Sequence, residues 1–237
     1  MPIANVKALF FDVFGTVVDW RSSISAELEE FGQKKQITVD WPAFANDWRG
    51  LYEPSMDAVR CGDREWRPLD TLHRESLITL ISRHNITGLN EEEIDHLNKA
   101  WHRLDPWPDS VEGLARLKAK YILATLSNGN ISLLVNMAKH AGLPWDAVLG
   151  AEPARAYKPM PQCYLRNAGF LDLEPAQCML VAAHNYDLAA ARTLGFRTAF
   201  VCRPSEYGPK QDKDLKAESD WDIVTDTMTG VAGALGC

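Results

Sequence analysis

The sequence lacks the features that mark membrane proteins and secreted proteins. No apolar run reaches the roughly eighteen residues of a membrane span, and the N-terminus has no basic segment followed by an apolar core, so we expect no signal peptide. The five cysteines form no CxxC pair and are odd in number, which is typical of reduced thiols. We therefore expect a cytoplasmic protein without a membrane partner.

Excess positive charge and metal-ligand patterns are also missing. The net charge of −7 argues against nucleic acid or an anionic membrane surface as a partner. The six histidines show no metal-ligand spacing with cysteines or acids, so we expect no metal site. What is present is an ordinary globular balance, with 46% hydrophobic residues among 237, which is enough to bury a sizeable core.

The most informative stretch lies at the start of the chain. Val6 to Phe11 is a nearly unbroken apolar run, which predicts a strand buried on both faces. The run ends at Asp12, and Gly15 and Thr16 then turn the backbone. Ligands of parallel α/β sheets bind outside the carboxyl ends of the strands, so Asp12 is well placed for chemistry. The alternative is that Asp12 only caps the following turn.

Residues 17–102 carry helical apolar spacing and no convincing strand. We expect the first helix to end at Gly32, and a second helix, with Pro42 in its first turn, to carry an aromatic face that includes Trp48. Asn90 is expected to be the N-cap of the last helix. The sequence thus predicts an all-helical domain, which we call the cap, inserted after the first strand.

Residues 103–237 alternate between strand and helix patterns. Asp109 is expected to cap one helix and Gly142 to end another. Alternation implies a parallel sheet with right-handed crossovers. We therefore predict an α/β fold: a doubly wound, Rossmann-like core of residues 1–16 and 103–237, with the cap at 17–102. Its further strands are expected at Tyr121–Leu126, Val148–Leu149, Cys178–Ala183, Phe196–Val201 and Ile223–Val224.

Polar residues follow several of these predicted strands, and a loop lysine joins them. In a doubly wound sheet they would meet in one crevice, and they exceed what capping requires. They are Asp12; Ser127 and Asn128; His184, Asn185 and Asp187; and Lys158.

The order of these motifs resembles the haloacid dehalogenase superfamily over nearly the whole chain. The motifs are Asp-x-x-Gly-Thr, Ser-Asn after a strand, Tyr-Lys-Pro, and an acid after a later strand. Phosphatases of that superfamily have a second Asp two positions after the first, which protonates the leaving group, and they use Mg²⁺. Here that position is Phe14, and the later acidic cluster is reduced to Asp187. The pattern therefore resembles the L-2-haloacid dehalogenase branch (type II), which implies a helical cap and no metal or other cofactor.

The resemblance implies catalytic roles for matching positions. Asp12 matches the nucleophile, Lys158 the lysine beside it, and Asp187 the acid that helps to position that lysine and water. Arg49 matches the arginine that receives the leaving halide; the alternative is a solvated arginine paired with Asp47 or Glu53.

His184 stands where this branch has an asparagine, and Ala182 replaces a serine. Both positions lie near the expected water and bear on the hydrolytic half-reaction and the preferred halide. His184 could serve as a base or shape a smaller pocket. The alternative is a buried histidine with satisfied hydrogen bonds.

Other positions match substrate-binding residues. Ser127 and Asn128 match the pair that holds the substrate and its carboxylate, and Tyr164 matches a pocket tyrosine, with helix packing as the alternative. Asn185 is a further binding candidate because it follows the same strand as His184. A dry apolar wall is expected from Phe14, Trp48, Tyr52 and Tyr186, although Trp48 and Tyr52 also suit the core of the cap.

The chemistry expected from the resemblance is hydrolytic dehalogenation of short (S)-2-haloalkanoic acids, with haloacetates including fluoroacetate as candidates. An ionised Asp12 attacks the carbon that bears the halogen, and water then hydrolyses the resulting ester to a 2-hydroxy acid. Lys158 would keep Asp12 ionised, since opposite charges about 4 Å apart attract by roughly 4 kcal/mol at an effective dielectric of about 20. The departing halide needs no proton, so Phe14 is compatible with this reaction.

Two other functions stay open at this point. One is a phosphatase-like hydrolase of the same fold that acts on a small phosphoester with Mg²⁺. The other is a non-catalytic module for dimerisation or ligand binding through the cap. A homodimer also fits the expected apolar faces of the cap helices.

Overall fold

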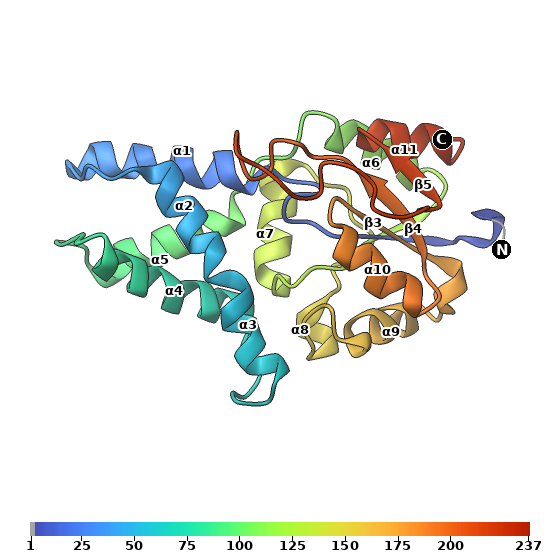
Figure 1. The fold of residues 1–237 in the computed structure, drawn as a ribbon, viewed down its shortest axis with the longest axis horizontal. Helices are drawn as coiled ribbons and strands as arrows, with labels where there is room; N and C mark the ends of the chain where they lie inside the picture. Colours follow the sequence, from blue (N-terminus) through green and yellow to red (C-terminus); the bar gives the residue numbers. More distant parts are fainter. Residues whose placement is uncertain (1–2) are drawn as a thin grey trace.

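The computed structural model describes residues 3–237. Within these residues, five strands form one parallel sheet in the order β2–β1–β3–β4–β5, which confirms the predicted doubly wound α/β fold (Figure 1). No helix in this range combines the length and the apolar character needed to cross a membrane. The strands are β1 Ala8–Phe11, β2 Ile122–Thr125, β3 Cys178–Ala182, β4 Arg197–Val201 and β5 Ile223–Thr225.

The helices fall into a cap group between β1 and β2 and a core group around the sheet. The domain boundaries between core and cap, at residues 16/17 and 102/103, stay a prediction. The cap group is α1 Trp20–Lys35, α2 Trp41–Gly50, α3 Tyr52–Arg60, α4 Leu69–Arg83, α5 Glu91–Asn98 and the 3₁₀ turn η2 Lys99–His102. The others are η1 Ile3–Asn5, α6 Ser110–Lys118, α7 Ile131–Ala141, α8 Ala151–Ala154, α9 Pro161–Phe170, η3 Pro175–Gln177, α10 Asn185–Thr193 and α11 Met228–Ala234.

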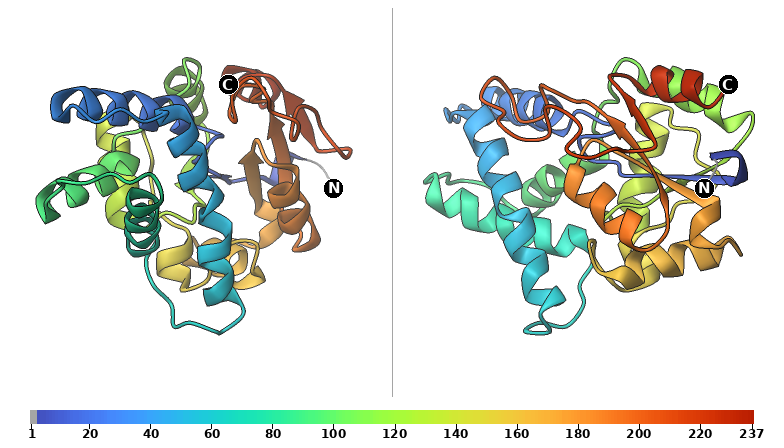
Figure 2. Two further views of the ribbon diagram at one scale, coloured as in Figure 1. Left: turned by 60° about the vertical axis from the view of Figure 1, so that its left-hand side comes forward. Right: turned by 45° about the vertical axis from the view of Figure 1, so that its right-hand side comes forward.

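Strand β1 lies inside the sheet, with β2 on one side and β3 on the other. All four of its residues are buried, which is why its sequence is apolar without alternation. Helices α6 and α11 pack together above the sheet in Figure 1, and α9 and α10 lie below it. The carboxyl ends of the strands point toward the cap helices, as both views of Figure 2 show. Asp12, directly after β1, therefore faces the cap.

The predicted strand at Val148–Leu149 is wrong. Isolated bridges lie on either side of these two residues, but they do not form a strand. The hydroxyl of Thr125 donates to the carbonyl of Leu149 (2.7 Å) and accepts from its backbone N–H (2.9 Å). A side chain thus satisfies the backbone groups that a strand ladder would pair.

The predicted helix end at Gly32 is also wrong, because α1 continues to Lys35 and Gln36 takes the left-handed conformation. A β-carbon on Gly32 would lie 2.5 Å from the indole of Trp41. The glycine therefore permits close packing of α1 against α2 instead of ending a helix. By contrast, Gly142 ends α7 with a φ of 67°, as predicted.

Two predicted helix caps have different outcomes. Asn90 forms a reciprocal capping box with Glu93 at the start of α5, which confirms it as the N-cap. Asp109 occupies the N-cap position of α6, but its side chain makes no capping hydrogen bond. Its carboxylate binds the guanidinium of Arg203 instead.

Candidate active site

Asp12 lies at the centre of a buried polar cluster beyond the end of β1. Its Oδ1 accepts a hydrogen bond from Nζ of Lys158 (2.8 Å), and its Oδ2 accepts one from the hydroxyl of Thr16 (2.7 Å). Nδ1 of His184 lies 3.0 Å from the same Oδ2. The side chain of Asp12 is thus held by groups from three segments, which exceeds the role of a turn cap.

Lys158 connects Asp12 to the second acid of the cluster. Its Nζ also binds Oδ2 of Asp187, whose Oδ1 accepts a hydrogen bond from the hydroxyl of Tyr164 (2.6 Å). The side chain of Asn128 accepts a hydrogen bond from the backbone N–H of Lys158 (2.8 Å). Residues from three predicted strand ends and the lysine loop therefore meet, as the sequence predicted.

The charges in this cluster favour an ionised Asp12. Burial by itself would raise the pKa of Asp12, but the ammonium of Lys158 and the contact with His184 outweigh it and hold that pKa well below its ordinary value. Burial would lower the pKa of Lys158, but Asp12 and Asp187 raise it above the usual range. Burial, together with the charge of Asp12, raises the pKa of Asp187. Of the two acids, Asp12 is the one held most firmly as an anion.

On its other side, His184 contacts a carboxylate that the sequence reasoning missed. Nε2 of His184 lies 3.0 Å from Oε2 of Glu206, and the indole N–H of Trp20 donates to Oε1 of the same residue (3.0 Å). Glu206 is fully buried. Burial would lower the pKa of His184, but Glu206 and Asp12 together raise it to about 10. The imidazole is therefore a cation between two anions at neutral pH.

Glu206 lies just beyond β4, in the irregular segment between β4 and β5. It belongs to no motif, and the one usable signal was its place shortly after the carboxyl end of a parallel strand. The sequence predicts Thr16 as part of a turn and of the Asp-x-x-Gly-Thr motif, but it assigns the residue no role in the site. Its hydroxyl also accepts a hydrogen bond from the backbone N–H of Ala183 (2.8 Å), so it links the ends of β1 and β3.

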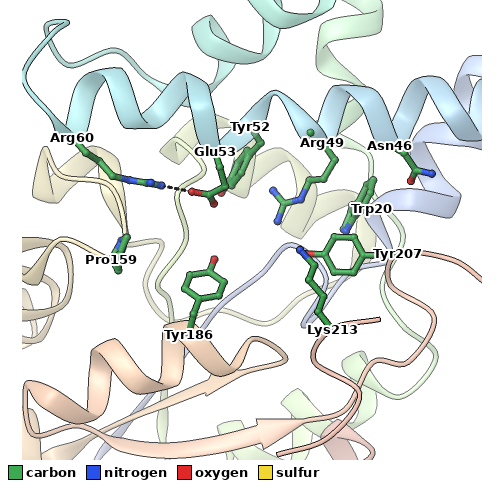
Figure 3. Close-up of a pocket in the computed structure, with 11 residues that line it drawn as sticks. Trp20, Asn46, Arg49, Tyr52, Glu53, Arg60, Pro159, Tyr186, Tyr207 and Lys213 are labelled. Carbon is green, nitrogen blue, oxygen red and sulfur yellow. Dashed lines mark hydrogen bonds and ion pairs between the residues drawn. The ribbon is translucent and has the colours of Figure 1, made fainter. Parts of the chain in front are cut away.

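A cavity of about 650 Å³ separates the cap helices α2 and α3 from the core (Figure 3). It borders the polar cluster, because Pro159 follows Lys158 and the ring centroid of Tyr186 lies 5.8 Å from that of His184. Its lining comprises Trp20, Asn46, Arg49, Gly50, Tyr52, Glu53, Arg60, Pro159, Tyr186, Tyr207 and Lys213.

Arg49 reaches into this cavity from α2 (Figure 3). Its guanidinium carbon lies 4.0 Å from the ring centroid of Tyr52, and its buried Nη1 has no hydrogen-bond partner among residues 3–237. The two nearby acids that could pair with it are engaged elsewhere: Glu53 pairs with Arg60 (2.7 Å), and Asp47 lies 3.2 Å from His84. The charge of Arg49 is thus available to an anion in the cavity.

Two further candidates lie close to the cluster. Phe14 is buried, and its ring centroid lies 6.4 Å from that of Tyr52 and 5.8 Å from that of Trp101. It therefore contributes an apolar surface beside Asp12. The hydroxyl of Ser127 accepts a hydrogen bond from the backbone N–H of Gly129 (3.1 Å), and its own proton has no acceptor within residues 3–237, so it can donate to a ligand.

Three predicted binding residues lie elsewhere. Trp48 packs inside the cap, where its indole N–H donates to the carbonyl of His73 (3.1 Å), so the structure favours its alternative as core. Tyr164 is fully buried against Asp187 instead of lining the cavity. Asn185 directs its amide toward the segment after β4, where packing of that segment on α10 decided its orientation.

Comparisons with known proteins find similar proteins over most of the chain. A family model described as haloacid dehalogenase-like hydrolase matches residues 6–195. The (S)-2-haloacid dehalogenase 4A of Burkholderia cepacia is 27% identical over 253 residues, which cover 97% of this chain and all of that protein. The sequence similarity therefore extends over both the sheet and the cap helices.

Solved structures are similar over the same range. A defluorinating L-2-haloacid dehalogenase is 50% identical and superimposes with a TM-score of 0.96, covering 98% of this chain and 96% of that one. A second L-2-haloacid dehalogenase is 47% identical with a TM-score of 0.95, covering 98% and 99%.

Proposed function

The chain belongs to the haloacid dehalogenase-like hydrolase family, and we propose that it releases halide hydrolytically from short (S)-2-haloalkanoic acids. The named relatives support a hydrolase that acts on carbon–halide bonds. The observation that carries the proposal is the buried Asp12, kept anionic by Lys158, with Phe14 where an acid would be needed for phosphate chemistry. Similarity to a defluorinating dehalogenase extends the proposed substrates to haloacetates, including fluoroacetate.

In the first half-reaction, the Asp12 carboxylate attacks carbon 2 of the substrate. A carbon–oxygen bond forms, the carbon–halogen bond breaks, and the halide leaves with the bonding electrons. Arg49, whose buried Nη1 is free among residues 3–237, receives the halide. Ser127 and Asn128 hold the substrate carboxylate, while Phe14 keeps the reacting carbon away from water.

In the second half-reaction, the ester itself changes the state of His184. Esterification removes the negative charge of Asp12, one of the two anions that raise the pKa of His184, so that pKa falls and the imidazolium releases its proton to solvent. Neutral His184 then takes a proton from water as the water attacks Cγ of Asp12. Glu206 stabilises the positive charge that returns to the ring.

The imidazole of His184 also carries out the remaining proton transfers. The tetrahedral intermediate collapses, and the departing alkoxide takes the proton from His184 to give the 2-hydroxy acid. The carboxyl proton left on Asp12 then passes to His184, which restores the initial ion pair. Each turnover converts one haloacid and one water into a hydroxy acid, a halide ion and a proton.

The donor set around Asp12 does not suit the Mg²⁺ of a phosphatase. Magnesium prefers oxygen ligands in octahedral geometry, but the ammonium of Lys158 lies between Asp12 and Asp187, where such an ion would bind. The side chain of Phe14 offers neither an oxygen ligand nor a proton. The phosphatase alternative is therefore disfavoured on chemical grounds.

Quaternary structure and cellular location stay predictions. We propose a homodimer, because large apolar side chains remain exposed on helices of both the cap and the core, such as Ile78 of α4 and Val135 of α7. Light scattering on the purified chain tests this. A cytoplasmic location is proposed from the cysteine pattern alone.

The proposed function is tested by halide release in EDTA. Fluoroacetate, chloroacetate and both enantiomers of 2-chloropropionate are the substrates, and we expect release that resists the chelator and favours the S enantiomer. Asp12→Asn should abolish turnover, whereas a non-catalytic module would be indifferent to it. Cleavage of a phosphoester with Mg²⁺, in the absence of any halide release, would overturn the proposal.

A further inference from the structure

The irregular segment of residues 202–222, which we call the strap, connects β4 to β5. It appears in orange-red in Figure 1, where it runs from the sheet toward the cap helices. The strap supplies Glu206 to His184 and supplies Tyr207 and Lys213 to the cavity wall (Figure 3). Because it lacks a helix or strand ladder, its position depends on side-chain anchors.

Asn185 is the main anchor of the second half of the strap, the part that contains Asp214 and Trp221. Its amide N–H groups donate to Oδ1 of Asp214 (2.9 Å) and to the carbonyl of Lys216 (3.0 Å). Its Oδ1 accepts hydrogen bonds from the backbone N–H of Glu218 (2.9 Å) and the indole of Trp221 (2.9 Å). Both donors and both acceptor positions of the buried amide are thus used by the strap.

His184, the neighbour of Asn185 in the chain, holds the first half through Glu206. Gln211 ties the two halves together, because its amide donates to the carbonyls of Arg203 and Lys213 (3.0 Å each). Two consecutive residues at the start of α10 therefore hold one segment at two points. A shift at the Asn185 end is transmitted through Gln211 toward Glu206.

We propose that Asn185 is a positioning residue for ester hydrolysis, which fixes the strap so that Glu206 contacts His184. The proposal rests on the function given above, in which His184 activates water. Asn185 does not line the cavity and does not touch the reacting atoms, so it acts through the strap, in which Glu206 is the residue that ester hydrolysis uses. Alkylation of Asp12, which depends on Lys158 and Arg49, does not require it.

If Asn185 supports ester hydrolysis but not alkylation of Asp12, replacing it should slow only the second half-reaction. In Asn185→Leu, ester hydrolysis slows, so kcat on chloroacetate should fall by about 10- to 100-fold, as for other catalytic groups displaced by about 1 Å. KM should fall in parallel and leave kcat/KM within about twofold, because alkylation is unaffected. Rapid mixing should show a burst of one chloride per enzyme, and mass spectrometry should find the ester on Asp12.

Two variants of Asp214 test the contact between Asn185 and the strap from the side of the strap. Oδ1 of Asp214 accepts from both the backbone and the side chain of Asn185. Asp214→Asn keeps an acceptor oxygen and tolerates the φ of 55°, so it should behave like the wild type. Asp214→Ala should reproduce part of the burst kinetics, and its effect should not add to that of Asn185→Leu.

The outcomes separate the two proposals. If the wild type releases no halide from any haloacid, the proposed function fails and this inference fails with it. If the wild type is active but kcat/KM falls as far as kcat in Asn185→Leu and Asp214→Ala, with no ester on Asp12, then only the positioning role is overturned. Asp214→Ala decides the question if Asn185→Leu does not fold.

Discussion

Gly15 leaves open the space that the carboxylate of Glu206 fills. A β-carbon at position 15 would lie 2.1 Å from Oε1 of Glu206, and Gly15 has a φ of +83°. The turn after the nucleophile and the distant strap therefore fit together only because residue 15 lacks a side chain.

Gly15→Ala should displace Glu206 and lower kcat by about 10- to 100-fold. Gly88 is a matched control, because its φ is +79° and its β-carbon would meet open space. Gly88→Ala should cost about 1–2 kcal/mol of unfolding free energy for the left-handed backbone, with unchanged kcat. Equal kcat values in the two variants would contradict the proposed space for Glu206. Steady-state kinetics and urea unfolding provide the measurements.

Glu206→Gln should change the pH profile of kcat as well as its size. Ester hydrolysis needs neutral His184, so kcat of the wild type should rise with pH. Removing the charge of Glu206 removes a group that raises the pKa of His184, so the acid limb should move to lower pH. The maximal kcat should fall by about 100-fold, as for lost acid–base assistance. An acid limb at the wild-type position would argue against contact between the two groups.

His184 should also make stability depend on pH. Its folded pKa of about 10 lies above the ordinary value of 6.5. Its stabilising contribution is therefore complete below about pH 6.5 and is lost as pH rises through about 10. The difference in melting temperature between the wild type and His184→Asn should be largest near pH 6 and should narrow toward pH 10. A constant difference across this range would contradict the raised pKa.

Lys158→Met should destabilise the fold and abolish halide release. It removes the ammonium that lies between the buried carboxylates of Asp12 and Asp187, and breaking a buried ion pair typically costs about 3–5 kcal/mol. Adding Asp187→Asn removes one of the two charges, so the double variant should recover part of the stability while remaining inactive. Denaturant unfolding measures both variants. No recovery in the double variant would indicate that Lys158 acts through packing instead of charge.

Arg49→Met should lower kcat/KM for haloacids by about 100- to 1000-fold, the typical cost of removing a donor to developing negative charge. Arg60 lines the same cavity but is paired with Glu53 and Asp57, so Arg60→Met is the matched control. We expect only a small change in that variant. Similar losses in both variants would point to a general field of positive charge instead of a specific halide contact.

The sequence alone supported much of the fold. The apolar run before Asp12 predicted the buried strand β1, and Gly142 marked the end of α7, since both signals depend on a few neighbouring residues. The helix end predicted at Gly32 was wrong because that signal also depends only on neighbouring residues. The helical context of Gly32 suggested an end, but contact with Trp41 of another helix explains the glycine.

The candidate site was predictable where a strand end carried a polar residue, as at Asp12 and Asp187. The sequence did not predict in which direction each side chain near a strand end points. Asn185 and Tyr186 are neighbours at the start of α10, yet the first binds the strap and the second faces the cavity. The turn of the helix and the path of the strap decide between these directions.

The α/β class, the helices inserted after β1 and the acid at the end of β1 followed from the sequence, because apolar periodicity and strand-end residues depend on a few neighbouring positions. The pairing of Asp12 with Lys158, 146 residues away, followed from the resemblance in motif order. Only the tertiary structure decided that Glu206 contacts His184 across 22 residues of chain, and Trp20 across 186. Such contacts depend on which strand ends become neighbours and on how closely an irregular segment can approach them. In this protein, that approach is permitted by the missing side chain of Gly15.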